Sequence, residues 1–298
     1  MHVGVVVKRS SYRTYVEDQR SARVKRLLAA GDPTVRRMKR AHDDHESTVR
    51  EVLDALDKHA VRADVLMGSH ASFEQTYDLL ITVGGDGTLL AASHRLGPQT
   101  PLLGINSAPD HSVGYFCAGQ KGRVGVTVEA ALRGELRRTA LSRMRVELNG
   151  ECLHNRVLNE ALFCHACPAA TSRYILEVES AGGAAASEEQ KSSGLWIGPA
   201  AGSTAAQRSA GGRVLPLASK KIQFVVREPY APLGDKLKLR TGLVEEDGRL
   251  VLRNKMQDAR IFVDGHHTVF EATIGDVLVM RRSDEPLTVL GLERRTAS

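Results

Sequence analysis

Apolar runs separated by glycines and polar turns predict a parallel α/β arrangement in the first 120 residues. Short β-branched runs are typical of buried strands, whereas apolar residues spaced three and four apart indicate helices. The predicted strands are His2–Lys8, Val61–Met67, Asp78–Val83 and Pro101–Ile105, and the predicted helices are Tyr12–Ala30, 47–60 and Leu89–Leu96. This alternation of strand and helix is the pattern of a parallel sheet covered by helices.

The pattern changes beyond Gly119, where one predicted helix, Val124–Leu132, is followed by short alternating strands. The main ones are Ala140–Leu148, Val157–Phe163, Tyr174–Ser180, Leu195–Gly198, Lys221–Arg227, Lys236–Thr241, Arg249–Leu252, Ala259–Val263, Asp276–Arg281 and Leu287–Leu292. Many strands at short spacing predict a mainly antiparallel β-sandwich. We therefore expect an α/β domain over residues 1–120 and a β-rich domain over residues 121–298. The pattern leaves open that the last segment packs back on the first domain.

Composition narrows the class of protein mainly by exclusion. The 298 residues carry a formal net charge of +6, with 42% hydrophobic and 26% charged residues, which is typical of a soluble globular protein. No apolar run approaches the ~20 residues of a membrane helix. The chain enters a predicted strand at once, without the pattern of a secretory signal, so we expect a cytoplasmic protein.

Positive charge is concentrated near the amino terminus. Eleven Lys and Arg residues lie between Lys8 and Arg40, against three acidic residues. Such a cluster can attract a polyanion, including an anionic nucleotide. Aromatic interleaving and known DNA-binding motifs do not accompany it, so solvated helix faces are the simpler interpretation. We expect neither nucleic acid nor membrane as a partner.

Cys164 and Cys167 have the CxxC spacing of some metal and redox sites. No second pair completes a zinc site, and Pro168 follows where a redox motif needs a helix start. We interpret these cysteines as buried or loop thiols and predict no metal-ligating residues.

The most informative segment is Gly84-Gly85-Asp86-Gly87-Thr88, which follows a predicted strand and opens a predicted helix. Glycines let the backbone approach a phosphate, and a helix start offers free N–H groups. The segment is neither a Walker A loop nor a GxGxxG fingerprint. A carboxylate here repels phosphate unless it binds a metal or accepts a proton. Asp86 is therefore a candidate general base or magnesium ligand, with an ordinary Asp-Gly turn as the alternative.

Two further segments predict contacts with a polar ligand. Asn159 and Glu160 interrupt the predicted apolar strand Val157–Phe163, and burying them costs free energy unless they find partners. Ribose hydroxyls would be suitable partners, and an edge strand is the alternative. A block of small residues follows, in which the hydroxyls of Ser203, Thr204 and Ser209 can form directional hydrogen bonds. A flexible linker is the alternative for this block.

Together these segments resemble the NAD kinase family over nearly the whole chain. Residues 84–88 match its GGDGT signature, residues 159–160 its NE/D motif, and residues 202–212 its GSTA…SAGG block. Asp264-Gly265 resembles the closing β segment of the family. GGDGT alone is shared with phosphofructokinases and lipid kinases, but three motifs in order are specific to NAD kinases.

Departures from the common pattern resemble the branch that contains plant NADH kinases and animal mitochondrial NAD kinases. Asn106 opens a longer segment than the compact Asn-x-Gly-Arg-Leu-Gly-Phe run of most members. Ser193 stands where the family carries an Asp before Gly, and Ala206 replaces its Tyr. Both are ligand-contacting positions in the family, so we expect the nicotinamide-side subsite to differ. A neutral Ser193 predicts that NADH is used at least as efficiently as NAD.

The resemblance implies a kinase that transfers a phosphoryl group from ATP to the 2′-hydroxyl of the adenosine ribose of NADH or NAD. Asp86 would accept the hydroxyl proton, while Mg²⁺ and the glycine-loop amides neutralise the donor phosphates. The implied ligand-binding residues are Gly84, Gly85, Gly87, Thr88, Asn106, Asn159, Glu160, Ser193, Gly202, Ser203, Thr204 and Ser209. The resemblance also implies a homodimer.

Two other function classes stay open. A lipid kinase of the diacylglycerol or sphingosine type shares GGDGT, although its acceptor needs an apolar entrance and aromatic residues total only 4%. A noncatalytic dinucleotide sensor would be expected to lose the base, yet Asp86 is present. Incubation with ATP, magnesium and either dinucleotide distinguishes these classes.

Overall fold

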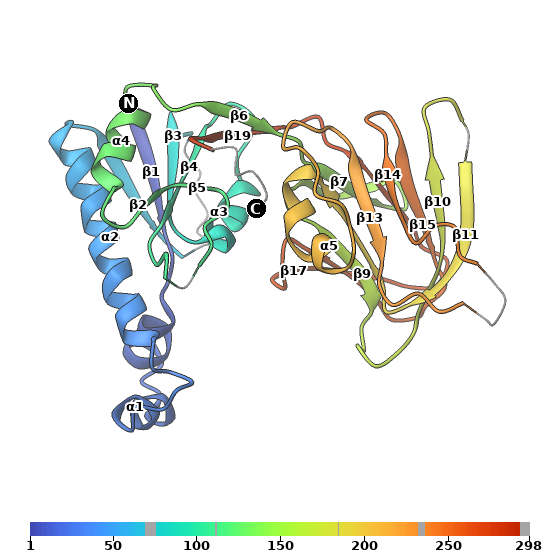
Figure 1. The fold of residues 1–298 in the computed structure, drawn as a ribbon, viewed down its shortest axis with the longest axis horizontal. Coiled ribbons are helices and arrows are strands. Elements are labelled where there is room, and N and C mark those ends of the chain that lie inside the picture. The colour runs from blue at the N-terminus through green and yellow to red at the C-terminus, as the bar shows by residue number, and fades with distance from the viewer. Residues whose placement is uncertain (69–75, 111, 184, 232–235, 293–298) are drawn as a thin grey trace. The chain divides into compact units, whose positions relative to one another are not determined.

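The computed structural model describes residues 1–68, 76–110, 112–183, 185–231 and 236–292, and the chain divides into two compact units (Figure 1). Unit 1 comprises Met1–Thr139 and Thr288–Ser298, and unit 2 comprises Ala140–Leu287. The division lies beyond the predicted boundary near residue 120 because helix α4 (Val124–Leu132) packs on helix α2 (Met38–Lys58) of unit 1.

Unit 1 is built on a largely parallel sheet with strand order β2-β1-β3-β4-β19-β6, and β5 pairs with β4. Its strands are β1 (His2–Val7), β2 (Arg62–Met67), β3 (Leu79–Gly84), β4 (Leu102–Asn106), β5 (Cys117–Gln120), β6 (Arg138–Leu141) and β19 (Leu287–Leu290). Besides α2 and α4, the other helices are η1 (Arg13–Asp18), α1 (Ala22–Ala29) and α3 (Asp86–Ser93). The pairs that β4 forms with β3, β5 and β19 are all parallel.

Helices cover both faces of the unit 1 sheet (Figure 1). Val52 and Leu56 of α2, with Val124 and Val128 of α4, pack on the side chains of β1, β3 and β4 that point to one face. Helix α3 lies on the opposite face in Figure 1, where its buried Leu89 approaches β4. Burial on both faces explains why these strands are continuous apolar runs.

The parallel register places three chain segments at one edge of this sheet. Val7 pairs with Val83, and Gly84 pairs with Asn106, so β1, β3 and β4 end side by side. Ligands of open parallel sheets bind at the carboxyl ends of the strands. The segment after β1, the glycine loop after β3 and the loop after β4 therefore meet where a ligand is expected.

Two helix predictions for unit 1 differ from the structure. The predicted helix Tyr12–Ala30 is divided into η1 and α1 by a turn at Arg20, whose φ is 51°. Helix α2 begins at Met38 rather than near residue 47. Its buried face starts with polar residues, His42 and His45, which an apolar pattern does not reveal.

Unit 2 consists of two antiparallel six-stranded sheets. One has the order β11-β10-β15-β18-β7-β8 and the other β14-β13-β12-β9-β16-β17. The strands of the first sheet are β7 (Met144–Leu148), β8 (Glu151–Val157), β10 (Ser172–Glu179), β11 (Ala185–Ser192), β15 (Arg249–Asn254) and β18 (Val277–Arg282). Those of the second are β9 (Ala161–His165), β12 (Leu195–Pro199), β13 (Ile222–Val226), β14 (Thr241–Val244), β16 (Ala259–Val263) and β17 (Thr268–Ala272). Two short helices, η2 (Ala200–Thr204) and α5 (Ala206–Ser209), follow β12.

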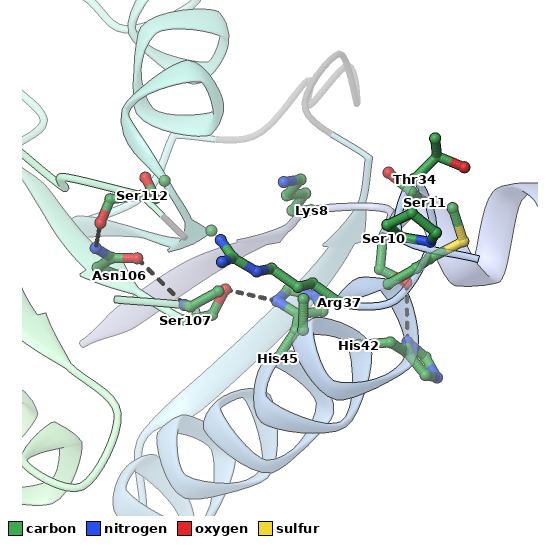
Figure 2. Close-up of a pocket in the computed structure, with 16 residues that line it drawn as sticks. Lys8, Ser10, Ser11, Thr34, Arg37, His42, His45, Asn106, Ser107 and Ser112 are labelled. Atoms are coloured by element: carbon green, nitrogen blue, oxygen red, sulfur yellow. Dashed lines mark hydrogen bonds between the residues drawn. The ribbon is translucent and has the colours of Figure 1, made fainter. Parts of the chain in front are cut away.

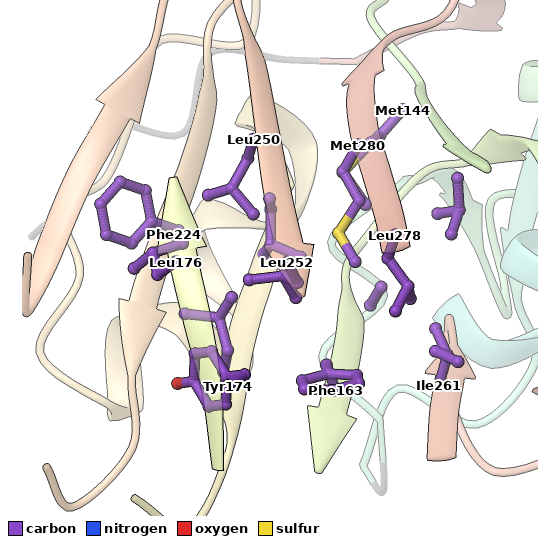
Figure 3. Packing of buried hydrophobic residues seen from close by; sticks show 14 of the residues in the cluster. Met144, Phe163, Tyr174, Leu176, Phe224, Leu250, Leu252, Ile261, Leu278 and Met280 are labelled. Carbon is purple, nitrogen blue, oxygen red and sulfur yellow. The ribbon is translucent and has the colours of Figure 1, made fainter. Parts of the chain in front are cut away.

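The core of unit 2 is formed by side chains from both sheets (Figure 3). Phe163 of β9 meets Tyr174 of β10 edge to face, with ring centroids 5.4 Å apart. Leu252 and Met280 join them from β15 and β18, and Ile261 from β16. This interdigitation of two inner faces confirms the predicted sandwich.

Three predicted strands of the β-rich region are wrong. Ala140–Leu148 is not one strand, because β6 ends at Leu141 and β7 begins at Met144. Val157–Phe163 is not one strand, because β8 ends at Val157 and β9 begins at Ala161. Asn159 and Glu160 therefore lie in a turn, whose N–H groups bond to Asp264. Lys236–Thr241 is also not a strand, since β14 begins only at Thr241.

None of the helices in the described ranges combines the length and apolar character that crossing a membrane requires.

Candidate active site

The glycine loop of unit 1 allows a close approach that side chains would prevent. A Cβ on Gly84 would overlap the hydroxyl of Thr88, and a Cβ on Gly85 would lie 2.6 Å from the Oγ of Ser112. Thr88 is buried, and its N–H donates to the carbonyl of Gly85. Gly87 is exposed and has open space around it. The loop is thus held by Thr88 and Ser112, and its backbone is accessible at Gly87.

The Asp86 carboxylate is fixed by two backbone groups. The N–H of Tyr115 donates to its Oδ2 and the N–H of Phe116 to its Oδ1, both at 2.9 Å. Asp86 is also the first residue of α3, where the helix dipole favours a negative charge. Each carboxylate oxygen has a second lone pair, so the group can still accept a proton or bind a cation.

Asn106 holds the long segment that follows β4. The side chain is 4% exposed; its Nδ2 donates to the carbonyl of Ser112 at 2.9 Å, and its Oδ1 accepts from the N–H of Ala108 at 3.2 Å. A Cβ on Gly114 would lie 2.5 Å from this Nδ2. The amide therefore closes the segment onto the glycine loop, while its direct contact with a ligand stays a prediction.

A cavity of about 440 Å³ opens in unit 1 where β1, β3 and β4 end (Figure 2). Gly84, Gly85 and Asn106 line it, whereas Asp86 does not. Lys8 and Arg37 also line it, and neither side chain forms a hydrogen bond or ion pair with another residue of the described ranges. Figure 2 shows Arg37 extending toward the Asn106 side of the cavity. Two available cations beside a glycine loop make this cavity suitable for a polyanion.

Two buried histidines form one wall of this cavity. His45 Nδ1 lies 2.9 Å from the Oγ of Ser107, and His42 Nδ1 lies 2.8 Å from the Oγ of Ser10 (Figure 2). Burial lowers the pKa of His45, so its ring is neutral at pH 7. The histidines connect α2 to the loops.

Sequence reasoning missed Lys8, Arg37 and His45. It attributed the basic run to solvated helix faces. Lys8 could have been found, because it ends the predicted parallel strand His2–Lys8 and so belongs to the same sheet edge as Gly84. Arg37 and His45 come from the start of α2, whose position the apolar pattern did not give.

In unit 2, the Asn159–Glu160 turn meets the small-residue block. A Cβ on Gly202, like one on Gly198, would overlap the carbonyl oxygen of Asn159. Gln207 is fully buried, and its Nε2 lies 3.5 Å from the same oxygen. The structure thus brings together two motifs that are about 40 residues apart, through backbone contacts that only glycine permits.

The polar side chains of the turn and the small-residue block differ in whether they are free to bind a ligand. Glu160 is 8% exposed, and its Oε2 has no hydrogen-bond partner among the described residues. Burial, together with the charge of Asp264, raises the pKa of Glu160 to about 8. Ser203 is fully buried, donating to the carbonyl of Ala200 at 2.7 Å and accepting from the N–H of Leu215 at 2.9 Å. Its hydroxyl holds the loop, and its contact with a ligand stays a prediction.

Thr204 and Ser209 remain accessible for a ligand. Thr204 is half-buried at the end of η2, and Ser209 is exposed at the end of α5. The half-buried Asn159 amide forms no hydrogen bond with another side chain in the parts of the chain that the structure describes. These groups are the ones that can bind polar atoms without breaking internal bonds.

Ser193 lies apart from the Asn159–Glu160 turn, beside the far end of β9. It lines a second cavity of about 380 Å³ with Cys164, Arg227 and Glu228. Its N–H donates to the carbonyl of Arg227 at 3.0 Å. Burial raises the pKa of the Cys164 thiol, so this group is uncharged at pH 7. The cavity thus places a neutral serine between a cation and an anion.

Comparison with known proteins identifies the family. Residues 3–135 match the family described as ATP-NAD kinase N-terminal domain. A protein of Oryza sativa subsp. japonica, described as "Probable NADH kinase", is 36% identical over 226 residues, covering 70% of this chain and 69% of that protein. The NADH kinase of Arabidopsis thaliana is 33% identical over 261 residues, or 82% of each chain. The chain belongs to the NAD kinase family.

Other members of the NAD kinase family extend the comparison to archaea. The NAD kinase of Methanoregula boonei is 29% identical over 235 residues, covering 78% of this chain and 81% of that protein. The crystal structure of an NAD kinase from Archaeoglobus fulgidus in complex with ATP has a TM-score of 0.67 and covers 99% of this chain and 95% of its own. At 19% identity, it shows a shared fold. Family membership makes this chain a kinase, and the conserved fold carries its motifs.

Proposed function

We propose that this NAD(H) kinase uses ATP to phosphorylate the 2′-hydroxyl of the adenosine ribose of NADH and NAD. The observation that carries the proposal is the unit 1 cavity, where Lys8 and Arg37 face the glycine loop. A triphosphate is opposite in charge to these cations, and the glycine backbone permits close approach. Relatives named NADH kinase and NAD kinase support the same acceptor.

Asp86 is the proposed general base. Its carboxylate is held by the Tyr115 and Phe116 amides, so its orientation does not depend on the ligand. The adenosine ribose of the acceptor must reach this carboxylate, which takes the 2′-hydroxyl proton as the new phosphate ester bond forms. The bond between the transferred phosphorus and the ADP oxygen breaks, and ADP leaves.

The donor set of unit 1 fits a magnesium ion that arrives with the nucleotide. Among the described residues there is no cluster of three His, Cys, Asp or Glu side chains suited to a metal. Mg²⁺ characteristically binds one or two carboxylates together with substrate phosphates and water, and Asp86 is the carboxylate of this loop. When bound, the ion would neutralise charge on the donor phosphates.

The dinucleotide is assigned to unit 2, at the turn and small-residue block. The Asn159 amide and the Thr204 hydroxyl are available there, and the Glu160 carboxyl has one free oxygen. We further infer that NADH is used at least as well as NAD. Ser193 brings no negative charge to its cavity, so it adds no attraction for the positive ring of NAD. Specificity constants for both dinucleotides, measured at the same ATP and magnesium, test this preference.

The decisive experiment is an assay of the full chain with ATP, Mg²⁺ and NAD or NADH, in which NADP or NADPH is quantified. Asp86→Asn should lower turnover by roughly two to four orders of magnitude while calorimetry shows dinucleotide binding largely intact. Asp57→Asn, which removes an exposed acid of α2, is the matched control and should leave turnover unchanged.

Three results would contradict the proposal. Near-wild-type turnover of Asp86→Asn removes this residue from the mechanism. Phosphorylation of diacylglycerol or sphingosine, with neither dinucleotide used, would favour the lipid kinase alternative. Dinucleotide binding without any phosphorylation would favour a sensor.

A further inference from the structure

Asp264 is bonded to the Asn159–Glu160 turn through four hydrogen bonds. It follows β16 directly and has a positive φ of 47°. Its Oδ2 accepts from the N–H of Leu158 at 2.8 Å, and its Oδ1 accepts from those of Asn159 at 2.7 Å and Glu160 at 2.9 Å. The Asp264 N–H donates to the Glu160 carbonyl at 2.9 Å. Three consecutive backbone donors thus converge on one carboxylate.

The turn is held from its other side by the small-residue block. Gly198 and Gly202 contact the Asn159 carbonyl so closely that a Cβ on either would overlap it. The N–H groups of the turn therefore face Asp264, and a carbonyl faces the glycines. An ionised acceptor suits this arrangement, because charge-assisted hydrogen bonds are the stronger ones. An asparagine would have to turn an NH₂ group toward one of the donors.

We propose that Asp264 is a positioning residue for the dinucleotide: its carboxylate fixes the backbone of residues 158–160 and so determines where the Asn159 amide and the Glu160 carboxyl meet the ligand. The inference rests on the proposed function for the identity of that ligand. Asp264 acts through its neighbours and is not itself assigned a contact with substrate.

The charge of Asp264 has a second consequence, at Glu160. Arg143, which is fully buried, is the cation that Asp264 interacts with, and its pKa of about 10 keeps it protonated. Among the described residues, the charged group that acts on Glu160 is Asp264, and Gly198, on which a Cβ would lie 2.8 Å from the Cα of Glu160, is neutral. Burial and this negative charge raise the pKa of Glu160 to about 8. At neutral pH Glu160 therefore carries a proton and donates a hydrogen bond to an acceptor atom of the ligand.

The protonation of Glu160 provides a readout that a purely structural role would not change. Its folded pKa lies above the ordinary value of 4.5, so between pH 4.5 and 8 Glu160 binds more protons in the folded chain than in the unfolded chain. The contribution of Glu160 to the free energy of unfolding therefore falls as the pH rises through this window. Without the Asp264 charge, the upper limit of the window should move to lower pH.

The test compares Asp264→Asn with Asp276→Asn. Asp276 also holds a turn of unit 2, accepting from the N–H of Thr273 at 2.7 Å and from Asn149 at 2.8 Å. We expect Asp264→Asn to raise the dissociation constant for NADH roughly tenfold, with KM for ATP unchanged, because the ligand-facing groups of the turn shift. It should also shift the pH window of unfolding downward. Asp276→Asn should lower the free energy of unfolding, but it should change neither the dissociation constant for NADH nor the pH window of unfolding.

Glu160→Gln keeps the inference testable if Asp264→Asn folds poorly. This variant is neutral at every pH, so the free energy of unfolding should lose the contribution of Glu160 to its pH dependence between 4.5 and 8. The dissociation constant for NADH should lose the same contribution. Wild-type NADH affinity in Asp264→Asn would overturn the inference while the kinase assignment stands. A wild-type chain that binds NADH but does not phosphorylate it would overturn the kinase assignment and leave the positioning role. If the wild-type chain binds neither dinucleotide, both the kinase assignment and the positioning role of Asp264 fail.

Discussion

Carboxylates of similar chemistry have different roles in this chain because their donors differ. Asp86 and Asp264 each accept backbone N–H groups, two in one case and three in the other. Glu160 has a buried oxygen without a partner among the described residues, and it keeps its proton to higher pH. Backbone donors thus fix the orientation of two carboxylates, whereas burial and the charge of Asp264 raise the pKa of Glu160.

Ser193→Asp tests whether its cavity senses the charge of the nicotinamide ring. A new carboxylate beside Arg227 and Glu228 should attract the positive ring of NAD more than the neutral ring of NADH. We expect the ratio of kcat/KM for NAD to that for NADH to rise roughly tenfold. Ser193→Asn, which adds similar volume without charge, is the control. An equal ratio in both variants would show that this position does not sense ring charge.

Close backbone contact, rather than sequence neighbourhood, joins the elements of unit 2. The turn between β8 and β9 reaches η2 only because Gly198 and Gly202 have no side chain to separate them. Neither glycine has a positive φ. Glycine is therefore needed at these positions because a side chain would not fit, and not because of the backbone conformation.

Gly202→Ala should therefore destabilise unit 2 and weaken dinucleotide binding together. The added Cβ has to displace the Asn159 carbonyl, and overpacking of this kind costs about 1–3 kcal/mol of unfolding free energy. Denaturant unfolding and calorimetry with NADH measure the two effects. The control is Gly125→Ala, where helix α4 has open space, and it should stabilise the chain slightly. A Gly202→Ala chain as stable as wild type would contradict the contact.

The elements that sequence could predict are those whose local pattern agrees with their burial. Helix α4 and strand β16 have the predicted bounds, and β1 differs by one residue. The turn at residues 158–160 could not be predicted, because its bonds go to Asp264, more than 100 residues away. The start of α2 was missed because the buried positions of its first turns are histidines.

The candidate site was predictable as motifs but not as an arrangement. The glycine loop and the two segments of unit 2 were recognised from their residue types. Which hydroxyls and amides are already bonded internally, as in Asn106 and Ser203, depends on contacts that spacing does not show. Lys8 and Arg37 were hidden in a basic run, because they are exposed like most of its other members and differ from them in lining the unit 1 cavity.

On the scale of the whole molecule, the net positive charge comes from one segment of the chain. The segment from Lys8 to Arg40 carries a net charge of +8, although the whole chain carries +6. Arg37 of this segment lines the unit 1 cavity, whereas Arg23 lies on α1 and does not. The segment should attract anionic nucleotides to the protein in a salt-dependent way.

Arg37→Ala should raise KM for ATP roughly tenfold, since it removes a charged contact with the phosphates, and kcat should change little. Arg23→Ala should leave KM for ATP close to wild type at physiological salt. Steady-state kinetics at low and high salt separate the two effects, because KM for ATP in the wild type should rise with ionic strength. If KM for ATP were the same in the two variants, ATP would have to bind outside the Arg37 cavity.

The return of the last strand to unit 1 bears on how the protein is made. Strand β19 lies between β4 and β6 in the sheet, yet it consists of residues 287–290. A ribosome releases the first 139 residues long before it adds this strand. During translation β6 therefore waits without its neighbour in the sheet while all of unit 2 is synthesised, whereas β4 already pairs with β3 and β5. Folding of unit 1 is completed only after unit 2 has been synthesised, and a message truncated before β19 would yield a chain in which β6 lacks this neighbour.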